Sequence, residues 1–174
     1  MSVRLAGALI KRVMVGSTAA KRIMVGTGAT AVQVWTAFTS MGMSKSGTQV
    51  TTTNSTSSSA NTITGWVPQA AYPGTVIDAD TSLVMSESGE VTITATATIS
   101  SSGTASHSRG IHLRIDGANV ATDSTTVGSQ TSFATSYTGP VTAGQKIGMA
   151  AWVQATTSGY RNLTAAEIVV KPTV

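Results

Sequence analysis

The stretch Val91-Thr92-Ile93-Thr94-Ala95-Thr96-Ala97-Thr98-Ile99 decides the fold class of this chain. Every second residue is apolar, and four threonines fill the positions between them. Side chains on a β-strand point alternately to opposite faces, so this alternation predicts a strand with one buried face and one exposed face. Its β-branched residues favour the same conformation.

The sequence on both sides of this stretch carries similar patterns. Residues 111–115 alternate likewise and end at Asp116-Gly117, a dipeptide typical of a tight hairpin turn. Further strands are expected near Trp66–Val67, Thr75–Ile77, Leu83–Met85, Val120–Asp123, Thr131–Tyr137, Gly148–Ala155 and Ala165–Lys171. Short strands at this spacing predict an all-β protein whose C-terminal part is an antiparallel jelly-roll sandwich.

One expected strand, residues 148–155, has small or apolar side chains on both of its faces, including Trp152. Both faces therefore require cover from water. A subunit interface and a loop of the same chain are two ways to provide it, and the pattern does not separate them.

Composition limits the classes of protein to which the chain can belong. Charged residues make up 10% of the sequence, against about 25% in ordinary domains, and cysteine is absent. Neither a disulfide framework nor a thiolate metal site is expected. No apolar run reaches the ~18 residues that a membrane-spanning helix needs, and no signal peptide is predicted.

A short repeat stands near the start of the chain. Lys11-Arg12-Val13-Met14-Val15-Gly16-Ser17 returns as Lys21-Arg22-Ile23-Met24-Val25-Gly26-Thr27, and a third apolar run ends at Trp35. Each copy is a short β-branched run closed by glycine, which predicts small hairpins. Isolated hairpins are marginally stable, so we expect residues 1–43 to form a β-repeat arm that docks onto a partner. The alternative is a free hairpin whose basic side chains reach into solvent.

Charge is distributed unevenly along the chain. Residues 1–77 carry six basic and no acidic side chains, whereas residues 78–174 carry five basic and seven acidic ones. A basic arm calls for an acidic partner. We predict docking of the arm through Lys11, Arg12, Lys21, Arg22 and Trp35 on another protein. No nucleic-acid-binding motif is present, so nucleic acid is not an expected partner.

Residues 44–64 contain a stretch, Thr51–Ser59, made entirely of serine, threonine and asparagine. Such a stretch has too little apolar surface to fold alone. The sequence therefore predicts three parts: the arm (1–43), a flexible linker (44–64) and the jelly-roll domain (65–174).

No residues form a recognisable catalytic or metal-binding motif. His107 and His112 are five residues apart and would point to opposite faces of an extended segment, which argues against a shared metal. Asp78 and Asp80 are best explained as turn residues. We expect no enzymatic activity, no catalytic residue, no metal and no cofactor.

The aromatic residues include one candidate for an exposed contact. Tyr160-Arg161 follows Gly159 and is predicted to lie in a turn, where Tyr160 could stack on a sugar. Trp66, beside Pro68, is expected in the core near the start of the domain.

Two resemblances to known families follow from these motifs. Val141-Thr142-Ala143-Gly144-Gln145-Lys146-Ile147, ahead of a long late strand, resembles the C1q/TNF-like jelly roll, which implies a homotrimer. The Lys-Arg-[Val/Ile]-Met-Val-Gly-[Ser/Thr] repeats with Val34-Trp35 resemble the start of minor tail proteins from tailed phages, especially those of actinobacterial hosts. Gln145 stands where many jelly-roll relatives carry aspartate.

The resemblances imply a virion structural protein that is assembled in the host cytoplasm. A minor tail or tail-tip protein is expected, with the arm anchored to other virion proteins and the jelly roll exposed. A capsid decoration or head fibre protein has the same layout. A further alternative is an adhesion module that binds a host cell-surface glycan. No membrane association is expected.

Overall fold

The computed structural model describes residues 4–5, 8–9, 14–15, 18–19, 22–25, 32–36, 38–100 and 102–173. For residues 4–36 it describes the strand backbone and not the side chains. The chain divides into two compact units, Met1–Thr39 and Ser40–Thr173, here called the arm and the body.

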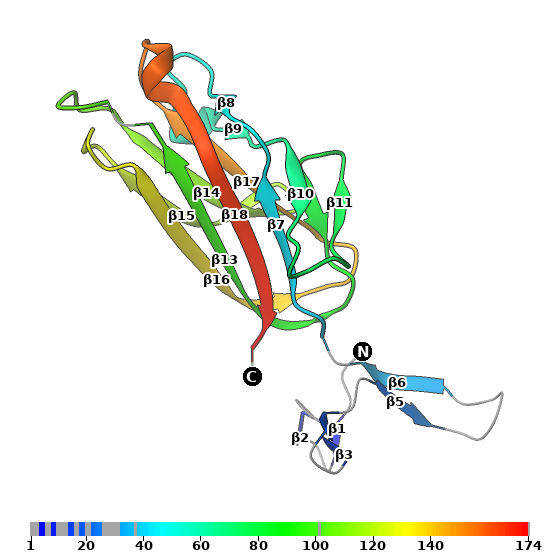
Figure 1. Cartoon of the computed structure of the whole chain (residues 1–174). Helices are drawn as coiled ribbons and strands as arrows, with labels where there is room; N and C mark the ends of the chain where they lie inside the picture. The colour runs from blue at the N-terminus through cyan, green and yellow to red at the C-terminus, as the bar shows by residue number, and fades with distance from the viewer. Residues whose placement is uncertain are drawn as a thin grey trace. The chain divides into compact units, whose positions relative to one another are not determined.

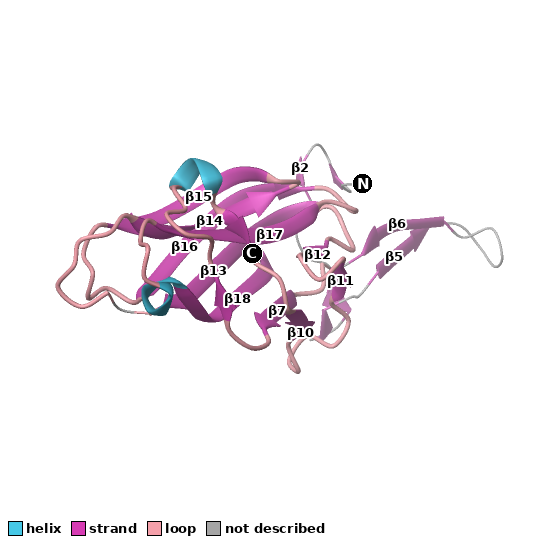
Figure 2. Ribbon diagram, turned by 90° about the horizontal axis from the view of Figure 1, so that it is seen from above, coloured by secondary structure: helices cyan, strands magenta, loops and turns pink. Residues whose placement is uncertain are grey.

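The body is a sandwich of two antiparallel sheets, so the predicted all-β jelly-roll class is confirmed. Sheet 1 has the order β10 (Trp66–Pro68), β7 (Met41–Lys45), β18 (Asn162–Pro172), β13 (Gly89–Ile99) and β16 (Ser132–Val141), with β8 (Gln49–Val50) also paired to β18. Sheet 2 has the order β11 (Val76–Asp78), β12 (Ser82–Val84), β17 (Lys146–Val153), β14 (Arg109–Ile115) and β15 (Ala118–Thr125), with β9 (Asn61–Thr62) also paired to β17. Figures 1 and 2 show these two layers.

The alternating stretch is the central strand β13, flanked by β16 and β18. Val91, Ile93 and Ala95 are completely buried between the sheets, whereas the threonines face outward. The opposite wall of the core comes from β14 and β17, where Leu113 and Ile147 are completely buried. Burial of each such aliphatic side chain contributes about 1.5–3 kcal/mol, which explains why this pattern predicts the strand so well.

The predicted hairpin at Asp116-Gly117 joins β14 to β15. Both residues have positive φ, +50° and +81°, as a two-residue turn of this kind requires. Glycine adopts this conformation freely, and aspartate tolerates it better than most side chains.

The prediction of a flexible linker at residues 44–64 is wrong. Three strands cover parts of this segment: the end of β7 and all of β8 belong to sheet 1, and β9 belongs to sheet 2. Residues 51–60, here called the strap, cross between the sheets, and Thr51 and Ser55 are buried. A segment without apolar side chains is ordered here because its backbone and hydroxyl groups bond to distant strands, which composition does not reveal.

The strap also explains how the second apolar face of residues 148–155 is covered from water. Trp152 and Ala150 lie on the outer face of β17 and are nevertheless 2% and 0% exposed. The strap's 3₁₀-helix η2 (Ser57–Ser59) contacts this region, and β9 pairs with Ala150 and Ala151. A loop of the same chain therefore supplies the cover, and no subunit interface is needed for it.

The described part of the arm consists of hairpins. They are β1 (Arg4–Leu5) with β2 (Ala8–Leu9), β3 (Met14–Val15) with β4 (Thr18–Ala19), and β5 (Arg22–Val25) with β6 (Val32–Thr36). The first two hairpins stand ten residues apart with the same register. The ten-residue spacing of the hairpins thus begins before the first Lys-Arg pair, at residues 4–9, whose sequence differs from that of the two motif copies.

The two ends of the sandwich differ in their connecting loops. Residues 100, 102–108, 126–131 and 154–160 lie at one end and are here called the apical loops (Figure 1). Residues 85–88, 116–117 and 142–145 lie at the other end and are called the basal loops. The chain enters the body at the basal end, because Met41 at the start of β7 pairs with Val170 near the end of β18.

Candidate binding surfaces

The outer face of sheet 1 is a broad surface with few charges. Thr92, Thr94, Thr96 and Thr98 of β13 point outward, and small or hydroxyl side chains from β16 and β18 flank them. The register places Thr94 between Ser136 and Val169, and Thr98 between Ser132 and Ala165. We call this surface the threonine face. Its charged side chains, among the residues described on β13, β16 and β18, are Glu90, Glu167 and Lys171.

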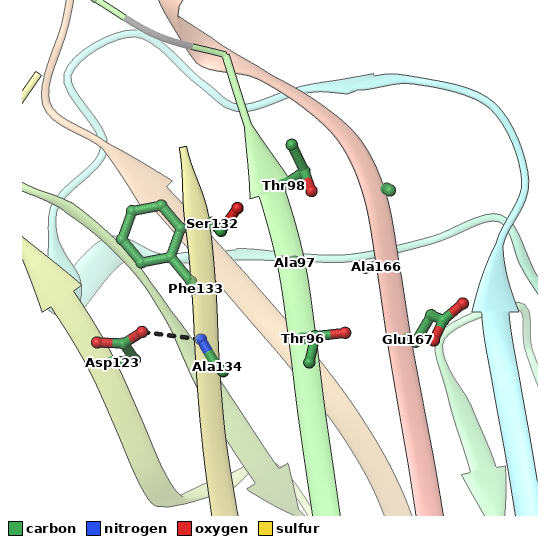
Figure 3. Close-up of a pocket in the computed structure, with 10 residues that line it drawn as sticks. Thr96, Ala97, Thr98, Asp123, Ser132, Phe133, Ala134, Ala166 and Glu167 are labelled. Atoms are coloured by element: carbon green, nitrogen blue, oxygen red, sulfur yellow. Dashed lines mark hydrogen bonds between the residues drawn. The ribbon is translucent and has the colours of Figure 1, made fainter. Parts of the chain in front are cut away.

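A shallow hollow of about 470 Å³ lies at the apical half of the threonine face (Figure 3). Its lining includes Thr96, Thr98, Ser132, Asp123 and Glu167. Asp123 accepts a hydrogen bond from the backbone N of Ala134 at 2.8 Å and so links the edge strands β15 and β16. This carboxylate therefore has a structural task, and the hollow does not contain a histidine that could work with Glu167 in proton transfer.

A second cluster lies on the outer face of sheet 2, under the strap. His112 is 3% exposed, and its ring stacks on Trp152 with centroids 4.6 Å apart. Its Nδ1 lies 2.7 Å from Thr122 Oγ1, and its Nε2 lies 3.0 Å from the carbonyl oxygen of Ser57. His112 thus lies on the outer face of β14, and the strap covers it.

The apical loops are held together by a buried arginine. Arg109 is completely buried, and its guanidinium donates hydrogen bonds to four carbonyl oxygens, those of Ser100, Gly128, Gln130 and Tyr160, at 2.6–3.2 Å. Burial lowers the pKa of Arg109. One side chain thus joins three loops that are distant in sequence.

The two residues predicted as an exposed contact have different environments. Tyr160 is half-buried at the apical surface, with its ring 6.0 Å from that of His107 in a tilted arrangement. Arg161 is 9% exposed, and its Nη1 donates to the carbonyl oxygen of Thr51. Arg161 is therefore wrong as an exposed contact residue. It attaches the strap to the apical end, where Thr51 N in turn donates to Arg161 O at 3.0 Å.

The basal end holds most of the charged side chains of the body. Lys146 Nζ lies 2.7 Å from Asp78 Oδ2, and this pairing raises the pKa of Lys146. Asp80 accepts from Gly65 N, and Asp116 from Lys146 N, both at 2.8 Å. Asp80 lies in a turn, as predicted, and its carboxylate satisfies a backbone amide, whereas Asp78 ends strand β11 and pairs with Lys146 instead. In the part of the chain that the structure describes, no group of three His, Cys, Asp or Glu residues could hold a metal ion.

The structure describes only some of the docking residues that are predicted for the arm. Lys11, Arg12 and Lys21 lie outside the described residues. Arg22 and Trp35 belong to the hairpin of β5 and β6, where Ile23 pairs with Trp35 and Arg22 pairs with Thr36. The backbone thus places Arg22 and Trp35 one register position apart. Docking through these residues stays a prediction.

Sequence reasoning missed the role of Arg109, although a signal for it existed. Arg109 has the same parity as Ile111, Leu113 and Ile115, so strand alternation places it on the buried face. No local sequence pattern predicts the contact between His112 and Ser57, because the two residues are 55 positions apart.

Comparisons with known proteins place the body among solved jelly rolls. No protein-family profile and no curated protein sequence matches the chain. The structure of Eiger TNF from S. frugiperda superposes with a TM-score of 0.51 at 11% identity, covering 78% of this chain and 93% of that one. The globular domain of zebrafish complement 1qA protein gives 0.50 at 9% identity, with 78% and 97% covered. Among the described residues no helix is long and apolar enough to cross a membrane. At these identities the likeness concerns the fold alone, and the body has the jelly-roll sandwich fold seen in these two structures.

Proposed function

We propose that this chain is a non-enzymatic structural protein of a phage particle. Its arm anchors it to other proteins of the tail or tail tip, and its body assembles as a homotrimer that is exposed on the particle. Assembly takes place in the host cytoplasm. The observation that carries this proposal is the threonine face, a broad strand surface that is exposed in the single chain.

The character of the threonine face supports self-association. Charged residues are depleted from the centres of protein interfaces, because their desolvation is expensive. The four outward threonines of β13 bring methyl groups and hydroxyls that can pair across an interface, as Thr92 and Thr138 already do within the sheet at 3.1 Å. The adjacent hollow can receive a small side chain from a second copy. The number of copies, three, rests on the resemblance to the C1q/TNF-like proteins.

The arm supports anchoring to another protein. Lys-Arg pairs recur in its sequence at a ten-residue spacing, its described strands form hairpins, and the acidic residues of the chain all lie in the body. Hairpins of two-residue strands bury little surface and gain stability when they add to a larger assembly. An acidic, partly apolar ring of virion protein fits this arm.

The histidine environments support a non-enzymatic role. His112 is enclosed beneath the strap with both ring nitrogens close to hydrogen-bonding partners, and His107 lies in an apical loop beside Tyr160. Neither histidine lies beside a carboxylate in a described ion pair or hydrogen bond, which is the arrangement that general acid–base chemistry uses.

Light scattering of the purified full-length chain tests the assembly. We expect the mass of three chains, and the double variant Thr94→Lys, Thr96→Lys should shift it to one chain, because it places charges in the proposed interface. Ser124→Lys, an exposed strand position on sheet 2, is the matched control and should stay trimeric. A monomeric wild-type protein would contradict the trimer.

Particle assembly tests the arm. Reversal of charge at Lys11, Arg12, Lys21 and Arg22 should block incorporation into particles, while the circular dichroism spectrum keeps its β signature. Normal incorporation of this variant would overturn anchoring through the basic pairs.

A further inference from the structure

The apical loops differ in charge from the opposite, basal end of the body. Residues 100–108, 126–131 and 154–160 contain no Asp, Glu, Lys or Arg, and neither does the strap. The basal end, in contrast, carries Asp78, Glu87, Asp116 and Lys146. The body is therefore polar in composition at both ends but charged at one end only.

The buried arginines leave the apical surface neutral. Arg109 and Arg161 lie near the apical end, yet both guanidinium groups point inward to backbone carbonyl oxygens. No positive charge is thus presented outward. Phosphate-bearing polymers and acidic polysaccharides, which are bound through clusters of exposed Lys and Arg, do not fit this surface.

The loops are ordered in spite of their small polar residues. Arg109 donates to carbonyl oxygens in all three loop segments, and Ser102 N donates to Gly128 O at 2.9 Å. Gly128 lies so close to Ala105 that a Cβ atom would not fit between them. A surface fixed in this way loses little conformational entropy when it binds.

The exposed groups on this surface are hydroxyls, amides and one aromatic pair. Serine, threonine and Gln154 offer donors and acceptors without a charge, and the rings of Tyr160 and His107 lie side by side. Tyrosine together with small hydroxyl residues is a combination that recognition loops use repeatedly. Large apolar anchors of the kind that dominate protein–protein interfaces are scarce here, with Val127 as the exposed example at 55%.

We infer that the apical loops form a binding surface for a neutral carbohydrate polymer, with Tyr160 as the stacking residue. A neutral sugar ring presents hydroxyl groups at its edge and C–H groups on its face, which match the loop hydroxyls and the tyrosine ring respectively. This inference deepens the proposed function, because it names the partner of the end of the body opposite to the one where the chain enters from the arm.

Affinity electrophoresis of the full-length protein tests the inference. Native gels contain dextran, mannan, galactan or arabinan, and carboxymethyl dextran provides an acidic polymer with the same backbone as dextran. We expect at least one neutral polymer to retard the protein, with retardation that persists at high salt. Retardation by the acidic polymer alone, or by no polymer, overturns the inference.

Variants of the apical residues locate the binding. Tyr160→Ala should weaken retardation at least about tenfold, and Tyr160→Phe, which keeps the ring, should retain most of it. Thr104→Glu adds a charge at an exposed loop position and should also weaken binding. This variant provides the test if Tyr160→Ala does not fold. Tyr72→Ala, a half-buried tyrosine outside the apical loops, is the matched control. Retardation that survives both Tyr160→Ala and Thr104→Glu overturns the assignment.

The readout separates this inference from the proposed function. Loss of glycan binding leaves the mass in solution and the incorporation into particles unchanged, whereas failure of the trimer or of the arm does not alter the chemistry of the apical loops. A protein that binds a neutral polymer as a monomer would support the inference and contradict the trimer.

Discussion

At the scale of single residues, Arg109 shows how a charge can be buried without an acidic partner. Its guanidinium is surrounded by four carbonyl oxygens, which carry partial negative charge and accept its protons. A buried charge of this kind contributes little by itself, but its removal leaves several buried acceptors unsatisfied. The side chain therefore acts as a structural tie for the apical loops.

Replacement of Arg109 by methionine is expected to lower the free energy of unfolding by roughly 3 kcal/mol, because hydrogen bonds to charged groups contribute about 1.5–3 kcal/mol each and water replaces only part of them. Urea unfolding followed by tryptophan fluorescence measures the change. Arg114→Met, at a half-buried position of the same strand, is the control and should cost less than about 0.5 kcal/mol. Equal losses for the two variants would contradict the role of Arg109.

Glu87 in a basal loop predicts a pH dependence. Burial raises the pKa of this carboxyl, so the folded protein binds its proton more tightly than the unfolded chain does. Stability from this group is therefore present below the unfolded pKa and decreases as the pH rises through the folded pKa. Glu87→Gln should raise the melting temperature slightly at pH 7 and leave it unchanged at pH 3, where both states are protonated. Calorimetry at the two pH values checks this, and a lower melting temperature at pH 7 would contradict it.

At the scale of secondary-structure elements, the strap is the feature that differs most from the prediction made from composition. The side chain of Ser55 takes the place of a neighbouring strand's backbone beside β17. Its Oγ accepts a hydrogen bond from Val153 N at 3.0 Å and donates one to Val153 O at 3.3 Å. The strap thereby continues the hydrogen bonding of β17 beyond β9 and shields Trp152 and His112. A stretch of small hydroxyl residues is suited to this because it packs closely against the sheet.

Removal of one strap hydroxyl should release this cover. Ser55→Ala leaves the buried N–H of Val153 without a partner and is expected to cost about 1–2 kcal/mol. Iodide quenching of tryptophan fluorescence should increase as Trp152 becomes accessible. Thr53→Ala, an exposed strap position, should change neither quantity. Unchanged quenching in Ser55→Ala would show that the strap is held by its other contacts.

At the scale of the whole molecule, the body separates its surfaces by chemistry. The threonine face carries few charges, the basal end carries most of them, and the apical loops carry none. Assembly, entry of the chain from the arm and contact with an external partner can then use different surfaces. The proposed trimer would bury the threonine face and leave the apical loops exposed.

Assembly of this kind predicts a concentration-dependent melting temperature. When folding is coupled to association, a hundredfold increase in protein concentration should raise the melting temperature by roughly 3–6 °C. The Thr94→Lys, Thr96→Lys variant should lose this dependence, whereas Ser124→Lys should keep it. Calorimetry across this concentration range measures the effect, and a constant wild-type melting temperature would contradict a trimer that is in equilibrium with its monomers.

Features of the fold that depend on neighbouring residues could be predicted from the sequence. Alternation placed β13 and its buried face, Asp116-Gly117 placed a hairpin, and the glycine-closed repeats indicated the hairpins of the arm. Each of these follows from backbone conformation and the solvation of side chains within a few positions. The uncharged apical loops were also visible in the sequence, but their assembly into one surface was not.

The hydrogen bonds between segments that are distant in sequence could be identified only from the folded structure. Ser55 bonds to Val153, 98 positions away, and Arg161 bonds to Thr51, 110 positions away. These contacts turned an expected linker into part of the sandwich and an expected surface arginine into a buried one. The physical reason is that a polar side chain is buried wherever the fold supplies its hydrogen-bond partners, and those partners are set by the pairing of strands and not by local sequence.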